Sequence, residues 1–269
     1  MKKGFGTILA RIFIYVMLAV MYAPIAILII FSFSGSSGIG AWSNFDFTGD
    51  LYLDLFQDAS ILGAVGNTFL IAIISSIIAT IIGSVSAVGI YYLPKRIKPI
   101  VSGMNQITVV NAEIVTAVAF MLFFIVCFGY MDGYPALIIS HTMITIPYVI
   151  LSVMPRLAQL NPNLYEAARD LGSGPFKALT SVLLPQMLPG IISGFVMAFT
   201  LSLDDFVITL FNKGSGIETI STLIYSSTKH GIAPAFRALS TIIFVGVLAV
   251  LIGINIFQAR ARRKTIKGA

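Results

Sequence analysis

Apolar side chains fill six long stretches of this chain, and polar residues are concentrated in the segments between them. By residue number the stretches run over about 12–33, 62–92, 102–128, 135–153, 188–211 and 236–258. Each is close to or above the roughly 20 residues that a helix needs to cross a bilayer. The runs are continuous rather than alternating, which favours membrane helices over the strands of a barrel. We therefore predict an all-α integral membrane protein with six transmembrane helices in a single domain over residues 1–269.

Composition agrees with a membrane environment. The chain is 57% hydrophobic and only 10% charged, with a mean hydropathy of +0.95. Soluble domains are typically about one quarter charged, so a water-soluble protein is excluded. The first apolar stretch has a basic start, but it is too long for a signal peptide and no convincing cleavage site follows it. We predict that it is a retained membrane helix.

Basic residues occupy alternate segments between the predicted helices. The N-terminal segment, the second and fourth loops and the C-terminal tail hold 14 of the 17 lysines and arginines. The first loop has no basic residue and carries four aspartates, Asp46, Asp50, Asp54 and Asp58. Because basic loops remain on the cytoplasmic side, this pattern predicts that both termini are cytoplasmic. The net charge of +6 is thus a sign of topology, and a nucleic-acid partner is disfavoured.

The segment 154–187 is the most polar loop, and it is predicted to be cytoplasmic. Asn161 suits an N-cap, Pro162 suits a first helical turn and Gly172 suits a helix end. The helix from Pro162 to Leu171 would be roughly 15 Å long. A helix of this length is marginal alone in water, so it needs a surface to pack on. That surface is either this chain's own helix bundle or another protein.

The spacing of residues in this loop resembles the EAA signature of ABC-importer permeases. Glu166-Ala167-Ala168 is followed by three residues, Gly172, nine residues and then Val182-Leu183-Leu184-Pro185. The family pattern has isoleucine where Val182 stands. The resemblance implies a type I importer transmembrane domain, in which this loop is the coupling helix. It also implies that Glu166, Ala167, Ala168 and Gly172 contact a cytoplasmic ATPase.

Three further segments narrow the resemblance to the spermidine/putrescine ABC permease family: "YAPIAILIIFSFS", "PRLAQLNPNLYEAARDLG" and "TLSLDDFVITLF". The family implies a multi-pass protein of the bacterial inner membrane. Its partners would be two copies of an ATPase that binds ATP-Mg, a second homologous permease and an extracytoplasmic substrate-binding protein. No cofactor is expected on this chain itself. Closure of the ATPases would draw the coupling helices together and open the pathway outward.

Ionisable residues within predicted spans are costly and are functional candidates by default. Asp204 and Asp205 lie in the fifth span and Glu113 in the third. Adjacent residues on a helix do not share a face, so one aspartate would line a pathway while the other caps a helix break or contacts a neighbour. His141 is expected to hydrogen-bond between helices. For a polycationic cargo, carboxylates supply attraction and aromatic faces supply cation–π contacts, with Phe206 and Tyr225 as candidates.

Nothing in the sequence indicates catalysis. No phosphate-binding loop, nucleophile elbow or His/Cys metal cluster is present, so no catalytic or metal-ligating residue is assigned. Energy for transport must then come from a partner ATPase or an ion gradient. The alternatives are an ABC permease for another small solute, an ion-coupled carrier using Glu113 and the two aspartates, or a membrane scaffold. A carrier often carries an inverted repeat, which we do not find, and it has no need of an EAA loop.

Overall fold

The structure is a computed structural model, and it describes residues 5–35, 45–129, 131–161, 163–228, 233–249 and 252. The chain divides into two compact units, residues 1–62 with 226–269 and residues 63–225. Across the described ranges the regular structure is helical, apart from one isolated antiparallel bridge between Ser34 and Phe47.

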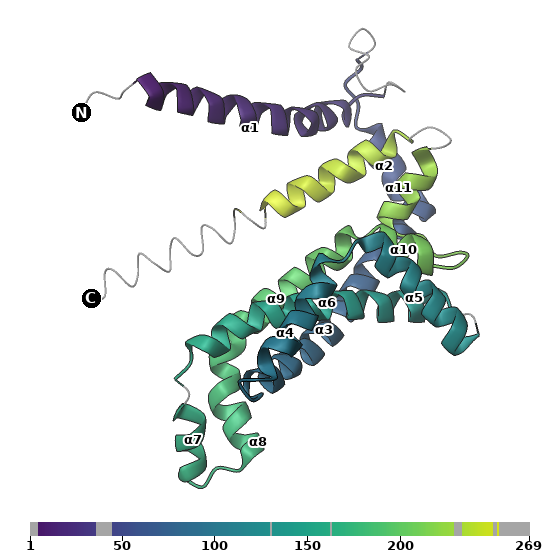
Figure 1. The fold of residues 1–269 in the computed structure, drawn as a ribbon. Coiled ribbons are helices and arrows are strands. Elements are labelled where there is room, and N and C mark those ends of the chain that lie inside the picture. Colours follow the sequence, from purple (N-terminus) through teal and green to yellow (C-terminus); the bar gives the residue numbers. More distant parts are fainter. Residues whose placement is uncertain are drawn as a thin grey trace. The chain divides into compact units, whose positions relative to one another are not determined.

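Figure 1 shows the described helices coloured in chain order. The first unit holds α1 (Phe5–Phe31), α2 (Asp50–Gln57), the start of α3 (Ala59–Tyr91), the end of α11 (Ile220–Thr228) and a helix Ala235–Ala249. The second unit holds the rest of α3 and α11 together with α4 (Lys98–Val110), α5 (Glu113–Phe128), α6 (Gly133–Gln159), α7 (Asn163–Asp170), α8 (Pro175–Ala178), the π-helical η2 (Leu179–Leu183), α9 (Leu184–Asp204) and α10 (Val207–Asn212).

Four described helices are long and apolar enough to cross a membrane, namely α1, α3, α6 and the continuous α8–η2–α9. The pair α4 and α5 makes a fifth span if it is taken together. The last predicted span, 236–258, is represented by the helix Ala235–Ala249 and Ile252, and its remainder lies outside the described residues. Pro162 lies outside them as well.

Two of the predicted spans are interrupted. The third, 102–128, is two helices that bend by 102° between α4 and α5, because Asn111 and Ala112 adopt extended backbone. The fifth, 188–211, ends as a helix at Asp204, and Asp205 is extended before α10 begins. Carboxylates stand at both breaks: Glu113 at the first, and Asp204 and Asp205 at the second. A polar side chain can satisfy the backbone groups that a break leaves unpaired. The fourth predicted span, 135–153, is α6, which continues through Pro155 to Gln159.

The core of the second unit lies between α3, α6 and α9, and α6 packs most extensively on α9. Glycines permit the close approach. A Cβ atom added at Gly83 would lie 2.7 Å from the Val149 Cβ, and one at Gly190 would lie 2.8 Å from the Arg156 Cγ. Small residues at such crossings are the usual means by which membrane helices pack closely.

We expect Gly83→Ala to destabilise the protein by about 1–3 kcal/mol, the usual cost of overpacking a close-packed core. Gly89→Ala on the same helix is the matched control, because an added Cβ there meets nothing within 4 Å. Thermal unfolding of the two variants in detergent measures the difference. Equal unfolding temperatures would contradict the assigned α3–α6 crossing.

Candidate functional site

Both helix breaks open onto one cavity of about 220 Å³ in the second unit. Side chains of five helices and of the two breaks line it: Thr108, Val109, Asn111, Glu113, His141, Ile144, Thr145, Tyr148, Leu201, Ser202, Asp204, Asp205, Phe206 and Val207. The structure therefore brings together Glu113, Asp204, Asp205 and Phe206, four of the five residues predicted to line a pathway. They come from spans that are far apart in the sequence.

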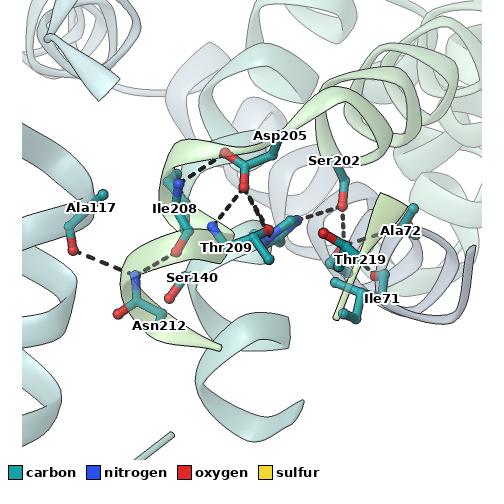
Figure 2. A network of polar contacts seen from close by, with 12 residues as sticks. Ile71, Ala72, Ala117, Ser140, Ser202, Asp205, Ile208, Thr209, Asn212 and Thr219 are labelled. Carbon is teal, nitrogen blue, oxygen red and sulfur yellow. Dashed lines mark hydrogen bonds and ion pairs between the residues drawn. The ribbon is translucent and has the colours of Figure 1, made fainter. Parts of the chain in front are cut away.

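Asp205 caps the helix that follows the second break. Its Oδ2 accepts hydrogen bonds from the Thr209 N–H and the Thr209 hydroxyl, each at 2.8 Å, and its Oδ1 accepts one from the Ile208 N–H at 3.3 Å. Figure 2 shows this carboxylate pointing at the first turn of α10. A carboxylate there satisfies free N–H groups and opposes the positive end of the helix. The sequence-based expectation that one aspartate caps a break is confirmed for Asp205.

His141 on α6 is 2% exposed and contacts both sides of the same break. Its Nδ1 lies 2.7 Å from the Ser202 Oγ on α9, and its Nε2 lies 3.1 Å from the Thr209 Oγ1 on α10. The Nε2 is also 3.4 Å from the Asp205 Oδ2. Ser202 in turn reaches Ser75 on α3, with 3.1 Å between the two hydroxyl oxygens. The predicted interhelical hydrogen bonding of His141 is confirmed.

Glu113 and Asp204 differ from Asp205, because both are exposed at the cavity. Neither makes a hydrogen bond or ion pair with any residue in the described ranges. The carboxyl ends of α4 and α9 reach the same cavity. Carbonyl groups at such ends lack intrahelical partners and carry partial negative charge. The amino ends of α5 and α10 line the cavity as well and carry the opposite partial charge. The features that suit a cation are therefore the two exposed carboxylates.

Aromatic rings border the cavity on two sides. Phe206 lines it directly. Tyr225 on α11, also predicted to line a pathway, is not among the lining residues and instead packs behind Phe206, with 4.9 Å between the ring centroids. Tyr148 on α6 also lines it. Tyr148 could not be identified from the sequence, because one tyrosine in an apolar span carries no distinguishing signal. Its only hint is its position about two turns after His141 on the same helix.

The predicted coupling helix forms at the far end of α6, where α7 and α8 lie side by side (Figure 1). Asn161 caps α7, since its Oδ1 accepts the Asn163 N–H at 3.0 Å. Gly172 ends it with a φ of 86°. The Gly172 N–H donates to the Arg169 carbonyl at 2.9 Å and the Ser173 N–H to the Ala168 carbonyl at 3.1 Å. This pair of bonds is a Schellman motif, so both predicted helix signals are confirmed.

α7 packs on the end of α3 through one aromatic pair, and apolar side chains next to the helix stay exposed. Tyr165 packs beside Tyr92, with 5.8 Å between the ring centroids, and this pair joins α7 to the end of α3. Partial burial raises the pKa of the Tyr92 hydroxyl, and Tyr91, Tyr165 and Glu166 add to the shift, so the group stays uncharged at neutral pH. Leu171 is 88% and Phe176 77% exposed.

Among the residues that carry the EAA pattern, Glu166, Ala167 and Gly172 are exposed and Ala168 is half-buried. Leu171, directly after α7, and Phe176 on α8 are two large apolar side chains that this loop leaves exposed. Exposed apolar side chains that gather on a surface are typical of an interaction site.

Comparison with known proteins gives consistent findings. Residues 79–266 match the family model described as binding-protein-dependent transport system inner membrane component. The spermidine/putrescine transport system permease protein PotC of Escherichia coli strain K12 is 36% identical over 97% of this chain and 96% of its own length. PotC of Haemophilus influenzae is 34% identical over 91% and 94%. The putrescine permease PotI of Escherichia coli is 32% identical over 92% and 89%.

Solved structures agree on the fold. A bacterial ABC transporter that imports the acidic polysaccharide alginate matches with a TM-score of 0.70 at 15% identity, over 93% of this chain and 94% of that one. The MetNI methionine ABC transporter matches with a TM-score of 0.58 at 22% identity, over 71% and 90%. Identities this low establish the fold alone. The fold is the one found in type I importer membrane domains, as the sequence predicted.

Proposed function

Because this chain belongs to the family of binding-protein-dependent transport system inner membrane components, we propose that it forms one half of the translocation pathway of an ATP-driven polyamine importer. Spermidine and putrescine are the expected cargo. The observation that carries the proposal is the cavity between the two helix breaks. It presents two carboxylates without partners among the described residues, together with aromatic rings.

The chemistry of the cavity suits an amine cargo. A polyamine alternates ammonium groups with methylene segments. The carboxylates of Glu113 and Asp204 attract the ammonium groups, while Phe206 and Tyr148 offer aromatic faces. The exposure of both carboxylates keeps the attraction weak enough for release, which conduction requires. Fold relatives import solutes of quite different charge, so the fold itself does not select the cargo.

We assign α7 and the adjoining turn as the surface that docks on the ATPase. The exposed Leu171 and Phe176 support this, as does the rigid helix end at Gly172. The proposed complex contains this chain, a second homologous permease, two ATPase copies holding ATP-Mg and an extracytoplasmic binding protein. The distribution of basic residues supports a topology in which both termini lie on the cytoplasmic side of a bacterial inner membrane. Energy is supplied by the partner, so this chain is a permease and not an enzyme.

Hydrolysis of ATP by the assembled complex tests the proposal. The complex is purified through a tag on this chain, and its ATPase rate is measured with binding protein that is empty, loaded with spermidine or exposed to a sugar. We expect the spermidine-loaded protein alone to stimulate hydrolysis. Equal stimulation in all three conditions, or no ATPase in the purified complex, would overturn the assignment.

A further inference from the structure

The buried imidazole of His141 joins the two halves of the interrupted fifth span. Its Nδ1 hydrogen-bonds with Ser202, the third residue from the end of α9. Its Nε2 hydrogen-bonds with Thr209, in the first turn of α10, and lies near the carboxylate of Asp205. Asp204 and Phe206 both lie between these two attachments. A residue bonded to each side of a break restrains the backbone between them.

The hydrogens in this network can be assigned consistently. Asp205 accepts both the N–H and the hydroxyl hydrogen of Thr209. The Thr209 oxygen is then an acceptor, so His141 donates to it from Nε2. In the neutral ring Nδ1 is left as the acceptor, and the Ser202 hydroxyl donates to it. Both ring nitrogens of His141 therefore have a hydrogen-bond partner. A buried hydrogen-bond network in which every group is satisfied is rigid.

The neighbouring residue supplies a contrast. Thr142 is also on α6 and is 6% exposed, yet its hydroxyl has no hydrogen-bond partner among the residues that the structure describes. Burial at this level of α6 therefore does not by itself bring a polar side chain into the network. The contacts of His141 are specific to the break.

We propose that His141 is a positioning residue for transport, which fixes the break between α9 and α10 and thereby holds Asp204 at the cavity. This inference rests on the proposed function and adds to it. His141 does not meet the cargo in this role. It sets the direction of a carboxylate that does.

A double-mutant cycle in reconstituted uptake of labelled spermidine tests the proposal. His141→Leu is expected to raise the KM for spermidine about tenfold, a factor that corresponds to losing a buried hydrogen bond. In an Asp204→Asn background the same substitution is expected to add little, because the group that it positions is already gone. Full additivity of the two effects would overturn the positioning role. Co-purification with the ATPase subunit should be unchanged.

Two further variants keep the test decisive if His141→Leu does not assemble. Ser202→Ala and Thr209→Val each remove a contact on one side of the break, and each should raise the KM about threefold with the same dependence on Asp204. Thr142→Val is the matched control and should transport normally. If Asp204→Asn alone leaves uptake unchanged, the role of Asp204 in the pathway fails, and the positioning role of His141 fails with it. If it lowers uptake while His141→Leu adds its full effect, only the positioning role fails.

Discussion

Replacing Gly172 with proline will uncouple transport through the membrane helices from ATP hydrolysis by the partner ATPase. The φ of 86° at this position is inaccessible to proline, whose ring fixes φ near −65°, and the substitution also removes the N–H that bonds the Arg169 carbonyl. The strain amounts to roughly 3 kcal/mol or more, so the end of α7 must rearrange. We expect ATP-dependent uptake to fall about 100-fold while the protein still inserts into the membrane, because the transmembrane core is untouched.

Gly174→Pro is the matched control for this experiment. Gly174 has a φ of −61°, which suits proline, and nothing lies within 4 Å of its added Cβ position. Its uptake should stay near that of the unaltered protein. Glu166→Lys and Leu171→Glu alter the exposed surface without bending the helix, and both should weaken co-purification of the ATPase. If the Gly172→Pro variant keeps the uptake rate of the unaltered protein, α7 does not transmit the movement of the ATPase to the membrane helices.

Asp204→Asn will lower the affinity of the pathway for polyamine without affecting assembly. The Asp204 carboxylate is exposed at the cavity and bonds no described residue, so its removal costs the fold nothing that the structure records. A charge-assisted hydrogen bond contributes about 1.5–3 kcal/mol, so the KM should rise roughly ten- to a hundredfold. Glu113→Gln should act in the same direction. Initial rates of labelled spermidine uptake over a concentration series give both values.

The neighbouring aspartate should respond differently. Asp205→Ala removes the cap of α10 and a partner of His141, so the purified complex should unfold at a lower temperature. Asp170→Asn, an exposed carboxylate on α7, controls for the loss of one negative charge. If Asp204→Asn and Glu113→Gln, singly and together, leave the KM unchanged, the acidic pathway is wrong.

The membrane helices could be predicted from the sequence because the transfer of about 20 apolar residues into lipid dominates every local preference. The helix ends at Asn161 and Gly172 could also be predicted, since caps are local features. The break at Asn111–Ala112 could not be predicted, and a break beside the aspartate pair was only one of two alternatives for those residues. Averaged hydrophobicity continues through both, and a single polar residue inside a span is compatible with an unbroken helix.

Tertiary contacts decide where those breaks fall. The Asp205 carboxylate replaces the lost backbone bonds of α10, and His141 arrives from another helix to hold both sides. The position of Tyr148 at the cavity depends in the same way on how α6 packs against α4 and α9. The acidic residues themselves were identifiable, because charge within a span is costly enough to require a reason. Their meeting in one cavity required the fold.

Uptake of labelled spermidine into proteoliposomes that contain the complete complex tests the central claim most directly. The binding protein is supplied outside, ATP-Mg is enclosed inside, and unlabelled amines, anions or sugars are added as competitors. We predict uptake that requires enclosed ATP and is suppressed by spermidine and putrescine alone. Uptake that continues without ATP under an imposed ion gradient would contradict the account, as would suppression by a sugar or an anion in place of the amines.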